Sequence, residues 1–557
     1  MDNGSVIGAL KNNLSTIQIL VAMVIYMTIV IVIGIVFAKK ANKNSENYFL
    51  GGRSLGPWVT AMSAEASDMS GWLLMGLPGV AYWCGLSDAV WTAIGLAVGT
   101  YLNWLIVSKR LRRYSVRANN SITLPDFFSN RFREKTPVIM TISSLFILIF
   151  FTFYAASCFV TCGKLFAQLF NLPYIPMMIV GAGFVLLYTI LGGFLAESVS
   201  DFMQAIVMVS ALIIIVVIGV VNAGGIGAVI ENAKSIPGFL SFFQIASPTT
   251  VDGAQTVVDG APQFGAAGAY GFITICSTLA WGLGYFGMPQ VLLRFMAIRK
   301  ENELKASRRI ASVWVVISLA VAVFIGIMGR TLFPIEHLTK ASAEGIFITL
   351  ATSSLLPIFA GFVMAGILAA TISSSDSYLL IAASAAAKNI FAGVIHKKAS
   401  DKQVMLVTRI TLVVIAVLAA IFALNENSVI FEIVSFAWAG FGATFGPLVL
   451  FSLFWKRTNR AGAIAGMVGG GCMVFFWEYA VGALGQNLAS IYALLPAFGV
   501  KEALWNTVLS KIPPVLEIYE LLPAFIFSAI CIVVVSLITK RPSKEIEEDF
   551  EIVKAGK

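Results

Sequence analysis

Residues 63–72 read Ser63-Ala64-Glu65-Ala66-Ser67-Asp68-Met69-Ser70-Gly71-Trp72. This run stands inside an otherwise apolar stretch, residues 58–80, which is long enough to cross about 30 Å of hydrocarbon as a helix. Two carboxylates and several hydroxyls at that depth are costly unless they bind something. A second weak stretch, Trp281-Gly282-Leu283-Gly284-Tyr285-Phe286-Gly287-Met288-Pro289, interrupts the apolar run 269–290. Both stretches predict broken membrane helices.

The composition places the rest of the chain in lipid as well. Of 557 residues, 58% are hydrophobic and only 12% are charged, a balance that is not typical of a soluble domain. Thirteen apolar runs of spanning length are predicted: 17–38, 58–80, 86–107, 137–163, 173–195, 202–222, 269–290, 311–330, 346–386, 408–424, 430–455, 461–483 and 520–539. The ninth run, with 41 residues, is too long for one span, and we expect it to turn along the cytoplasmic surface after Ser377.

The basic residues predict the orientation. The first run is uncharged and is followed by Lys39 and Lys40, which favours an uncleaved span with the N-terminus outside. An odd number of spans then puts the tail, residues 540–557, in the cytoplasm. The loops assigned to the inside hold 31 of the 38 lysines and arginines, in agreement with the positive-inside rule. The net charge of +9 is thus explained by topology in the lipid bilayer, and no nucleic-acid partner is expected.

The spans form an internal repeat. Residues 58–222 and 269–455 each hold five spans, and the two sets have opposite orientations. This is the pattern of an inverted-topology repeat, whose first helices are broken at the substrate and ion sites. We therefore predict one all-α membrane transport domain, residues 1–557, with an extra helix at 17–38, extra helices at 461–539 and a cytoplasmic tail.

Oxygen-bearing residues indicate an ion site. Sodium takes about five oxygens, so carbonyls released by a helix break and hydroxyls from another helix suit it. The ninth run supplies Ala370-Thr371-Ile372-Ser373-Ser374-Ser375-Asp376-Ser377. The alternative is that Ser373 and Ser374 bond to carbonyls of their own helix.

Three of the carboxylates in or beside the spans are candidates for charged roles. Asp68 must be paired or must face water or an ion, and no arginine or lysine is predicted deep inside a span to pair with it. Glu65 shares its helix face and could sit toward the cytoplasmic vestibule, and its role stays open. Asp201 either caps a helix N-terminus or belongs to a second ion site or a proton relay.

Aromatic residues on the same helices indicate a solute pocket. Trp72, Tyr154, Trp281 and Tyr285 lie on the two broken helices and on the third helix of the first repeat. Aromatic faces can enclose an apolar ring or a cation, although lipid contact or core packing would also explain them. Backbone amides around Ser70 and Gly71 would meet a carboxylate.

Four longer strings resemble a known family. They are Leu50-Gly51-Gly52-Arg53-Ser54-Leu55-Gly56-Pro57, Ala66-Ser67-Asp68-Met69-Ser70-Gly71-Trp72-Leu73-Leu74-Met75-Gly76-Leu77-Pro78-Gly79, Trp281-Gly282-Leu283-Gly284-Tyr285-Phe286-Gly287 and Ala437-Trp438-Ala439-Gly440-Phe441-Gly442-Ala443. They are similar to the sodium/solute symporters of LeuT-like fold, and within that family to its bacterial proline carriers. The similarity extends from about Tyr26 to Gly466.

The resemblance implies roles for individual residues. It implies a sodium site made by the carbonyls of Ala66, Met69 and Ala370 and the hydroxyls of Ser373 and Ser374, with Asp68 essential for sodium coupling. It implies a proline pocket lined by Ser70, Gly71, Trp72, Tyr154, Trp281 and Tyr285. Arg53 would act on the cytoplasmic side of the cycle, and Asp201 matches a position linked to a further ion site in some relatives. The departures are Glu65, where a small residue is expected, and the enlarged outer loop 484–519.

Together these observations predict sodium-coupled symport of L-proline in a bacterial inner membrane, driven by a gradient because the sequence has no GxxxxGK[ST] motif. The protein is then a transporter and not an enzyme, and no obligate protein partner is evident. The nearest alternatives are relatives' cargoes: pantothenate, a sugar, sialic acid or an inorganic anion. A kinase-linked sensor is disfavoured because only about 18 residues follow the last span, and a channel is a third alternative.

Overall fold

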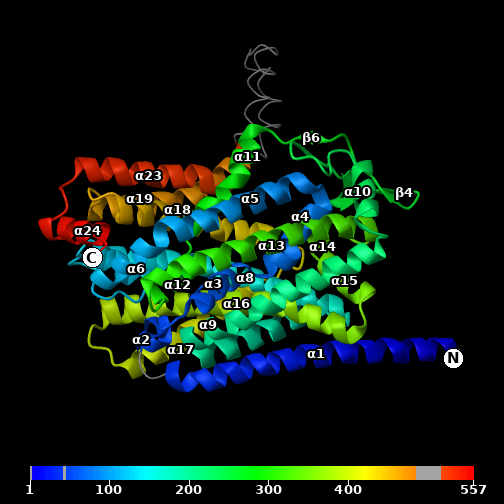
Figure 1. Ribbon diagram of the computed structural model, residues 1–557, viewed down its shortest axis with the longest axis horizontal. Coiled ribbons are helices and arrows are strands. Elements are labelled where there is room, and N and C mark those ends of the chain that lie inside the picture. The colour runs from blue at the N-terminus through cyan, green and yellow to red at the C-terminus, as the bar shows by residue number, and fades with distance from the viewer. Residues whose placement is uncertain (1–2, 42–44, 485–515, 557) are drawn as a thin grey trace, which may run out of the picture.

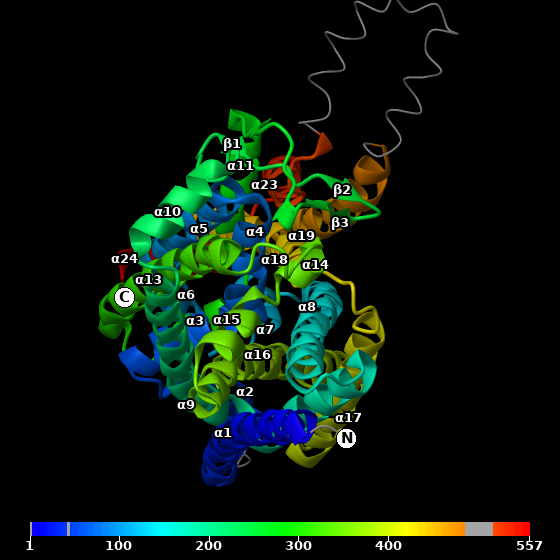
Figure 2. The same cartoon turned by 90° about the vertical axis from the view of Figure 1, so that its right-hand side faces the viewer.

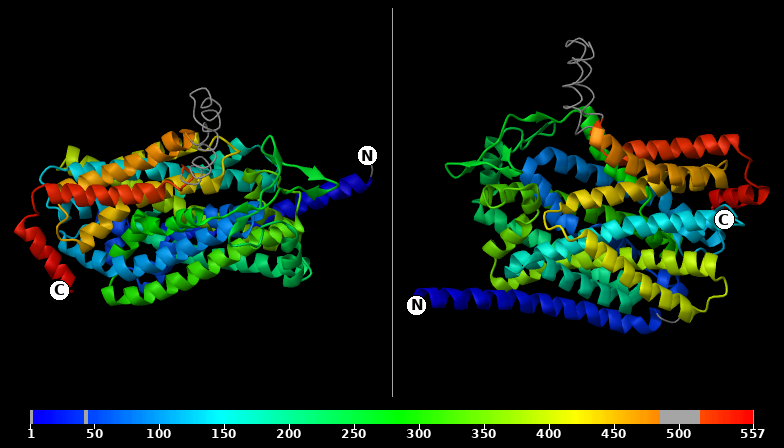
Figure 3. Two further views of the ribbon diagram at one scale, coloured as in Figure 1. Left: turned by 90° about the horizontal axis from the view of Figure 1, so that it is seen from above. Right: turned by 180° about the vertical axis from the view of Figure 1, so that it is seen from behind.

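A computed structural model describes residues 3–41, 45–484 and 516–556 of the protein. Its long helices run roughly parallel to one axis and form a bundle (Figure 1). The β-hairpins lie at one end of this bundle, near the start of α1, and the C-terminal helix α24 lies at the other end (Figures 1 and 3). The two described ends of the chain therefore lie at opposite ends of the bundle.

The first half of the chain is helical apart from short turns. Its α-helices are α1 (Asn3–Ala41), α2 (Ser45–Leu50), α3 (Pro57–Asp68), α4 (Leu77–Cys84), α5 (Leu86–Leu102), α6 (Ser108–Arg117), α7 (Leu124–Arg131), α8 (Val138–Phe170), α9 (Tyr174–Asn222) and α10 (Ile226–Ser235). Between them lie the 3₁₀ turn η1 (Gly51–Arg53) and the π-helical turns η2 (Trp72–Gly76) and η3 (Asn103–Val107).

The second half follows the same plan. Its α-helices are α11 (Phe272–Leu279), α12 (Pro289–Ala297), α13 (Leu304–Leu332), α14 (Lys340–Ala343), α15 (Ile346–Ser354), α16 (Pro357–Ser384), α17 (Asp401–Phe422), α18 (Ile430–Phe454), α19 (Arg460–Phe475), α23 (Leu521–Ile538) and α24 (Lys544–Ala555). The 3₁₀ turns η4 (Ala280–Phe286) and η5 (Glu301–Glu303) and the π-helical segments η6 (Ala385–Ile395) and η7 (Phe476–Val481) adjoin them.

Three small two-stranded antiparallel sheets separate the two halves, and the first and last of their six strands pair with each other around two hairpins. β1 (Gln244–Ile245) pairs with β6 (Gly268–Ala269), β2 (Thr250–Val251) with β3 (Ala254–Gln255), and β4 (Val257–Val258) with β5 (Ala261–Pro262). They follow α10 and lie over one end of the bundle, where Figure 2 shows them beside α14. This end is opposite the one that carries α24.

Ten helices in the described residues are long and apolar enough to cross a membrane. Three shorter apolar helices, Trp72–Cys84, Tyr174–Ile190 and Phe272–Phe286, overlap the predicted spans 58–80, 173–195 and 269–290. Two of these three stretches are the ones where we predicted breaks. The architecture is thus the mostly helical, multi-pass membrane fold expected from the sequence.

Both predicted breaks are present. α3 ends at Asp68, Met69 leaves the helical region with ψ 75°, and a π-helical turn follows from Trp72. In the second half, η4 ends before Met288, which is extended at φ −73° and ψ 110°. Pro289 then begins α12, and the residue before a proline avoids the α region for steric reasons.

One prediction about the chain path is wrong. We expected the ninth run to turn along the cytoplasmic surface after Ser377, but α16 continues through this residue to Ser384 and η6 extends it to Ile395. The run is instead divided at Leu355 and Leu356, where α15 ends and the extended backbone precedes Pro357. The proline is again the physical cause.

Helix α16 lies at the centre of the bundle, where it packs against α9, α8 and α1. At the opposite side α23 packs against α18 and α19, and Figure 1 shows α1 and α23 along opposite edges. The broken segment η4 is held by α5, because glycines let the two backbones touch. A Cβ on Gly99 would lie 2.3 Å from the Gly282 carbonyl oxygen.

This close approach predicts a stability difference between two glycine variants. Gly99→Ala should destabilise the protein by about 1–3 kcal/mol, because the added methyl group overpacks the contact between α5 and η4. Gly183→Ala is the matched control, since a Cβ there meets no atom within 4 Å. Thermal unfolding in detergent should show a lower midpoint for the first variant only, and equal midpoints would contradict this packing.

Candidate functional site

The break after α3 frees a carbonyl group in the interior of the bundle. The Ser70 amide, which would extend α3 by bonding to Ala66, donates instead to the Asp68 carbonyl at 3.1 Å. The Ala66 carbonyl accepts from the hydroxyls of Ser373 at 2.8 Å and Ser374 at 3.2 Å, both on α16. Two segments more than 300 residues apart in sequence therefore meet at one oxygen.

These contacts bring most of the predicted sodium residues together. The Ser373 hydroxyl also donates to the Ala370 carbonyl at 3.2 Å, and Met69 is buried at the C-terminal cap of α3. The alternative of bonding within one helix describes Ser375, whose hydroxyl donates to Thr371 at 2.6 Å. This alternative does not describe Ser373 and Ser374 fully, because the hydroxyls of both residues donate to the Ala66 carbonyl of α3. Neutral carbonyl and hydroxyl oxygens suit a hard cation such as sodium.

Asp68 joins the two broken helices. One of its carboxylate oxygens accepts a hydrogen bond from the Tyr285 hydroxyl at 2.8 Å, and the other accepts from the Gln290 amide at 3.5 Å. Trp72 donates from its indole nitrogen to the Asp68 backbone carbonyl at 3.2 Å. Asp68 is fully buried, and among the described residues no lysine or arginine forms an ion pair with it. Gln290 was missed from the sequence, because a lone glutamine after a proline carries no signal.

Aromatic rings gather next to this contact. Trp72 and Trp281 lie 6.4 Å apart between ring centroids. Trp281 also contacts Phe431 at 5.0 Å and stacks on Tyr519 at 5.2 Å. Tyr285 packs edge-on to Trp438 at 5.0 Å, and the Trp438 indole donates to the Trp281 carbonyl at 2.8 Å. Phe431, Trp438 and Tyr519 were missed as site residues, although the sequence comparison had singled out the string around Trp438.

The remaining predicted pocket residues come from α8 and the break. Tyr154 is buried and stacks on Tyr378 of α16 at 4.2 Å. Gly71 faces α8, where a Cβ would lie 2.4 Å from the Thr161 side chain. The hydroxyls of Ser70 and Tyr154 are buried and have no hydrogen-bond partner within the described part of the chain. These two hydroxyls remain available to a ligand.

Asp201 does not cap a helix. It lies two turns after the interruption of α9 at Gly193, inside the helix, and its carboxylate accepts from the Ser63 hydroxyl at 2.7 Å and from Arg294 at 3.2 Å. The expectation that no arginine lies deep in a span is also wrong. Arg294 is fully buried in α12, although we had counted it in a cytoplasmic loop because it precedes a basic stretch.

Arg294 lies at the centre of a charged cluster, one turn of α16 away from the predicted sodium residues Ser373 and Ser374. Its guanidinium donates to Ser63 at 3.0 Å, to the Gln290 carbonyl at 3.2 Å and to Ser377 at 2.8 Å, and it also pairs with Glu197. Asp376 accepts from the Ser377 amide at 2.7 Å. One guanidinium therefore faces three carboxylates, each with one oxygen that has no partner in the described residues: Glu197, Asp201 and Asp376.

Two further predicted residues have defined surroundings. Glu65, whose role was open, is buried and accepts from the Trp104 indole nitrogen at 3.1 Å, so it does not line an open vestibule in this structure. Arg53 donates to the Asn120 side chain at 2.9 Å and to the Ser121 carbonyl at 2.8 Å, and it also bonds the Met296 carbonyl near the end of α12. Arg53 thus ties α12 to the turn after α6.

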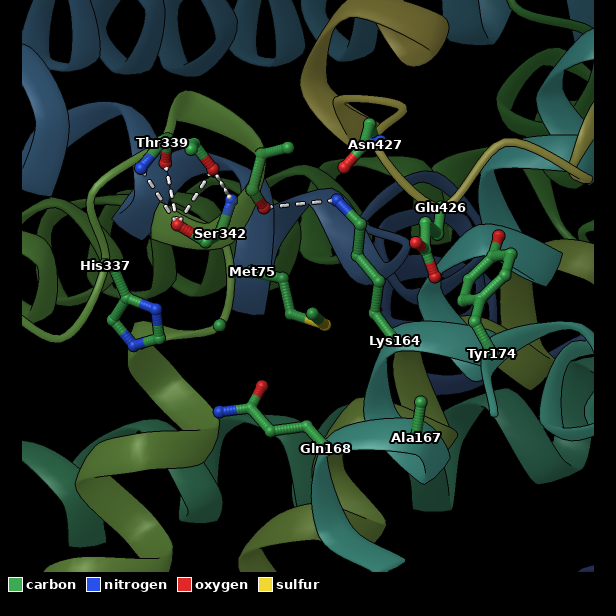
Figure 4. A pocket seen from close by; sticks show the side chains of 12 residues that line it. Met75, Lys164, Ala167, Gln168, Tyr174, His337, Thr339, Ser342, Glu426 and Asn427 are labelled. Atoms are coloured by element: carbon green, nitrogen blue, oxygen red, sulfur yellow. Dashed lines mark hydrogen bonds between the residues drawn. The ribbon is translucent and has the colours of Figure 1, made fainter. Parts of the chain in front are cut away.

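Toward the end of the bundle that carries the β-hairpins, a polar pocket lies next to the turn η2 (Figure 4). Met75 of η2 is at its floor, and Lys164, Gln168 and His337 line its walls. Lys164 donates to the Ala341 carbonyl at 3.2 Å and pairs with Glu344 at 2.7 Å. Burial, together with the charge of a nearby arginine, lowers the pKa of His337 to about 4, so this histidine is neutral at neutral pH.

Comparison with known proteins agrees with this geometry. The family model for the sodium:solute symporter family matches residues 48–470. Two Staphylococcus aureus proteins named sodium/proline symporter, from strains USA300/TCH1516 and JH9, are 38% identical over 540 residues, which is 96% of this chain and 96% of each relative. A solved structure of a Na⁺-coupled sialic acid symporter, in a substrate-bound outward-open state, covers 95% of this chain and 99% of that chain with a TM-score of 0.68 at 15% identity.

The chain belongs to the sodium:solute symporter family. It is therefore a multi-pass membrane transporter and not an enzyme. The likeness to the sialic acid symporter concerns the fold, because sequence identity is low.

The charged cluster predicts an uneven response to substitution. Arg294→Met should destabilise the protein by about 3–5 kcal/mol, because it leaves buried carboxylates without their cation. The triple variant Arg294→Met, Glu197→Gln, Asp201→Asn should recover much of this loss, since only one of the three carboxylates that face the guanidinium then keeps its charge. Thermal unfolding midpoints would measure both changes. A triple variant that is less stable than Arg294→Met alone would contradict the charge argument.

Proposed function

We propose that the protein carries L-proline into the cell together with sodium by alternating access. The observation that carries this proposal is the meeting of Ala66 with Ser373 and Ser374, one turn from the Asp68 contact that joins the two broken helices. Relatives named sodium/proline symporter match this chain over nearly their whole length. This match favours proline over pantothenate, a sugar, sialic acid or an inorganic anion.

Sodium is the co-transported ion, and its ligands are neutral oxygens. The carbonyls of Ala66, Met69 and Ala370 and the hydroxyls of Ser373 and Ser374 surround it. When the ion arrives, the two serine hydroxyls turn their lone pairs to it, and the Ala66 carbonyl exchanges two hydroxyl donors for the cation. Asp68 supplies the negative charge nearby and keeps the two breaks in register through Tyr285.

Proline is held beside the ion by the broken helices. Its carboxylate meets the free amides and hydroxyl around Ser70 and Gly71, and its apolar ring lies against the faces of Trp72, Trp281 and Tyr285. Tyr154 closes the pocket from α8 with a hydroxyl that is buried and has no partner within the described part of the chain. A pocket of this kind suits a small zwitterion with an apolar body.

Two charged residues link the binding of sodium and proline to the conformational changes of the transport cycle. Arg53 joins α12 to the turn after α6 at the end that carries α24, so it holds the cytoplasmic side closed until the ion and solute are bound. Asp201 is either a second ion ligand or part of a proton relay. Its position in a cluster with more carboxylates than cations supports both of these roles.

The topology proposed with this function has thirteen membrane crossings in a bacterial inner membrane. The N-terminus lies outside and the tail 540–557 lies in the cytoplasm, and the spans of 58–222 and 269–455 form the two inverted repeats. The whole chain then acts as one transport domain. Part of the outer loop 484–519 lies outside the described residues.

The driving force is adequate for accumulation. Moving one charge through about 100 mV gives about 2.3 kcal/mol, and a tenfold sodium gradient adds about 1.4 kcal/mol. Together these two contributions supply on the order of 3.7 kcal/mol, which can sustain proline accumulation by a factor between about one hundred and one thousand.

Uptake by purified protein in liposomes tests the function directly. With an inward sodium gradient, labelled proline should accumulate, whereas a potassium or proton gradient alone should give none. Unlabelled pantothenate, glucose or sialic acid in excess should not compete. If the intact protein accumulates no proline but a different solute instead, the symporter assignment stands and the proline assignment fails.

Asp68→Asn should raise the sodium concentration for half-maximal uptake at least about tenfold, because one buried negative charge near the ion is lost. The matched control is Asp88→Asn, since Asp88 also accepts a tyrosine hydroxyl, from Tyr270 at 2.9 Å, but is not among the proposed sodium residues. Uptake measured over a range of sodium concentrations would show the shift. An unchanged sodium requirement in Asp68→Asn would remove Asp68 from the coupling mechanism.

A further inference from the structure

A second buried arginine lies at the outer end of the bundle, away from the sodium and solute residues. Arg330 is near the end of α13 and is almost fully buried. Its guanidinium lies between two aromatic rings, 4.7 Å from the centroid of Tyr82 and 4.8 Å from that of Phe264. The rings cover the guanidinium faces and leave its N–H bonds at the edge to find acceptors.

The acceptors are too few. The Nη2 atom donates to the side-chain oxygen of Gln255 in β3, while Nε and Nη1 have no hydrogen-bond partner in the described residues. The Gln255 oxygen is held toward Arg330, because the amide nitrogen of the same side chain donates to the Gln263 carbonyl at 2.8 Å. No carboxylate in the described part of the chain lies at ion-pair distance from Arg330. A buried cation in this state lacks a counter-charge.

The comparison with Arg294 makes the deficit plain. Arg294 is equally buried, but all its nitrogens donate, and two carboxylates pair with it. Three carboxylates lie around Arg294, whereas no carboxylate in the described residues pairs with Arg330. The charge of Arg330 affects the neighbouring His337. Burial lowers the pKa of this histidine to about 4, and the positive charge of Arg330 is the second, smaller cause.

Arg330 also has open space beside it. It lines a cavity of about 410 Å³ between α10, the hairpin β4–β5 and the loop after α13. Asn232 and Ser235 of α10 provide polar groups on the opposite wall, and Pro262 and Phe264 provide apolar ones. Two elements that line it, α10 and the hairpin β4–β5, lie at the end of the bundle opposite α24 (Figure 1). It is large enough for a small ion or a carboxylate group with its water.

We propose that Arg330 and this cavity form a binding site for a small monovalent anion, either chloride or the carboxylate of a small solute. The anion accepts hydrogen bonds from the free guanidinium nitrogens and neutralises a charge that the protein itself leaves unpaired. Because the cavity walls come from α10, a hairpin and α13, the bound anion holds the outer loop segment against the bundle. The site is separate from Trp281 and Asp68, so it stands whether or not proline is the transported solute.

Thermal unfolding of the purified protein tests this site without any transport measurement. At constant sodium concentration, replacing a bulky sulfonate (MES) by chloride or bromide should raise the unfolding midpoint by a few degrees, and the rise should saturate with anion concentration. Adding L-proline in the sulfonate buffer tests the carboxylate source. If chloride is the ligand, the chloride response disappears in Arg330→Met while the proline response keeps its full size. If the solute carboxylate is the ligand, the proline response becomes smaller in Arg330→Met, and what remains comes from the separate transport site.

Two variants separate binding from folding. Asn232→Asp has nearly the same shape and adds a negative charge to the cavity wall, so it should weaken the anion response without a large loss of stability in the sulfonate buffer. Arg131→Met removes another buried arginine, which packs on Tyr114 at 4.9 Å on the side of α24, and it should keep the full response. The proposal is overturned if neither anion nor proline gives a response that depends on Arg330 and Asn232.

Discussion

A carbonyl group that loses its helical donor inside a membrane protein must find another donor or an ion. Ala66 is in this position because α3 stops at Asp68 and the Ser70 amide turns away. The two serine hydroxyls of α16 satisfy the carbonyl in this structure. They are weak enough donors to give way to a cation, whereas a backbone amide in a continuous helix would not. The central position of α16, packed against α8 and α9, follows from this need, since the hydroxyls must stay level with the break.

The buried charges explain how the halves of the molecule stay together. Asp68 has no cation beside it in the described residues and is held by two neutral donors of the other broken helix, Tyr285 and Gln290. A cation at Ala66 would therefore lower the cost of the Asp68 charge, and the ion and the contact between the helices support each other. Farther toward α24, Arg294 holds α12 against α3 through Ser63 and against α9 through Glu197. Neutral hydrogen bonds therefore join the two broken helices beside the predicted sodium residues. Charged hydrogen bonds of Arg294 join α12 to α3 and α9.

Much of this could be predicted from the sequence, because lipid imposes simple rules. Apolar length places the helices, and the polar run around Asp68 and the glycines around Trp281 show where they break. The partners from other helices could not be predicted. Gln290, Tyr378 and Trp438 have ordinary side chains whose meaning depends on which helix lies opposite. Arg294 was misplaced for a specific reason: it begins a basic stretch that looks like a loop, and only the packing of α12 shows that it is buried. The continuation of α16 past Ser377 was missed because its serines resemble a helix end, although each finds an acceptor within the bundle.

Helix α16 also connects the predicted sodium residues to the charged cluster around Arg294. Ser377 lies one turn after Ser373, and its hydroxyl is 3.1 Å from the Ser373 carbonyl, has the Glu197 carboxylate as its nearer acceptor and accepts from Arg294 at 2.8 Å. When a cation draws the hydroxyls of Ser373 and Ser374 toward itself, the turn that contains Ser377 is fixed with them. Arg294 then keeps Ser377 as a partner, and α12 stays against α16. If the ion left, this turn would be free to shift, and the guanidinium would lose one of the groups that hold α12 against α16. Coupling of this kind would need no long-range movement, because the predicted sodium residues Ser373 and Ser374 and the charged cluster share a single turn of one helix.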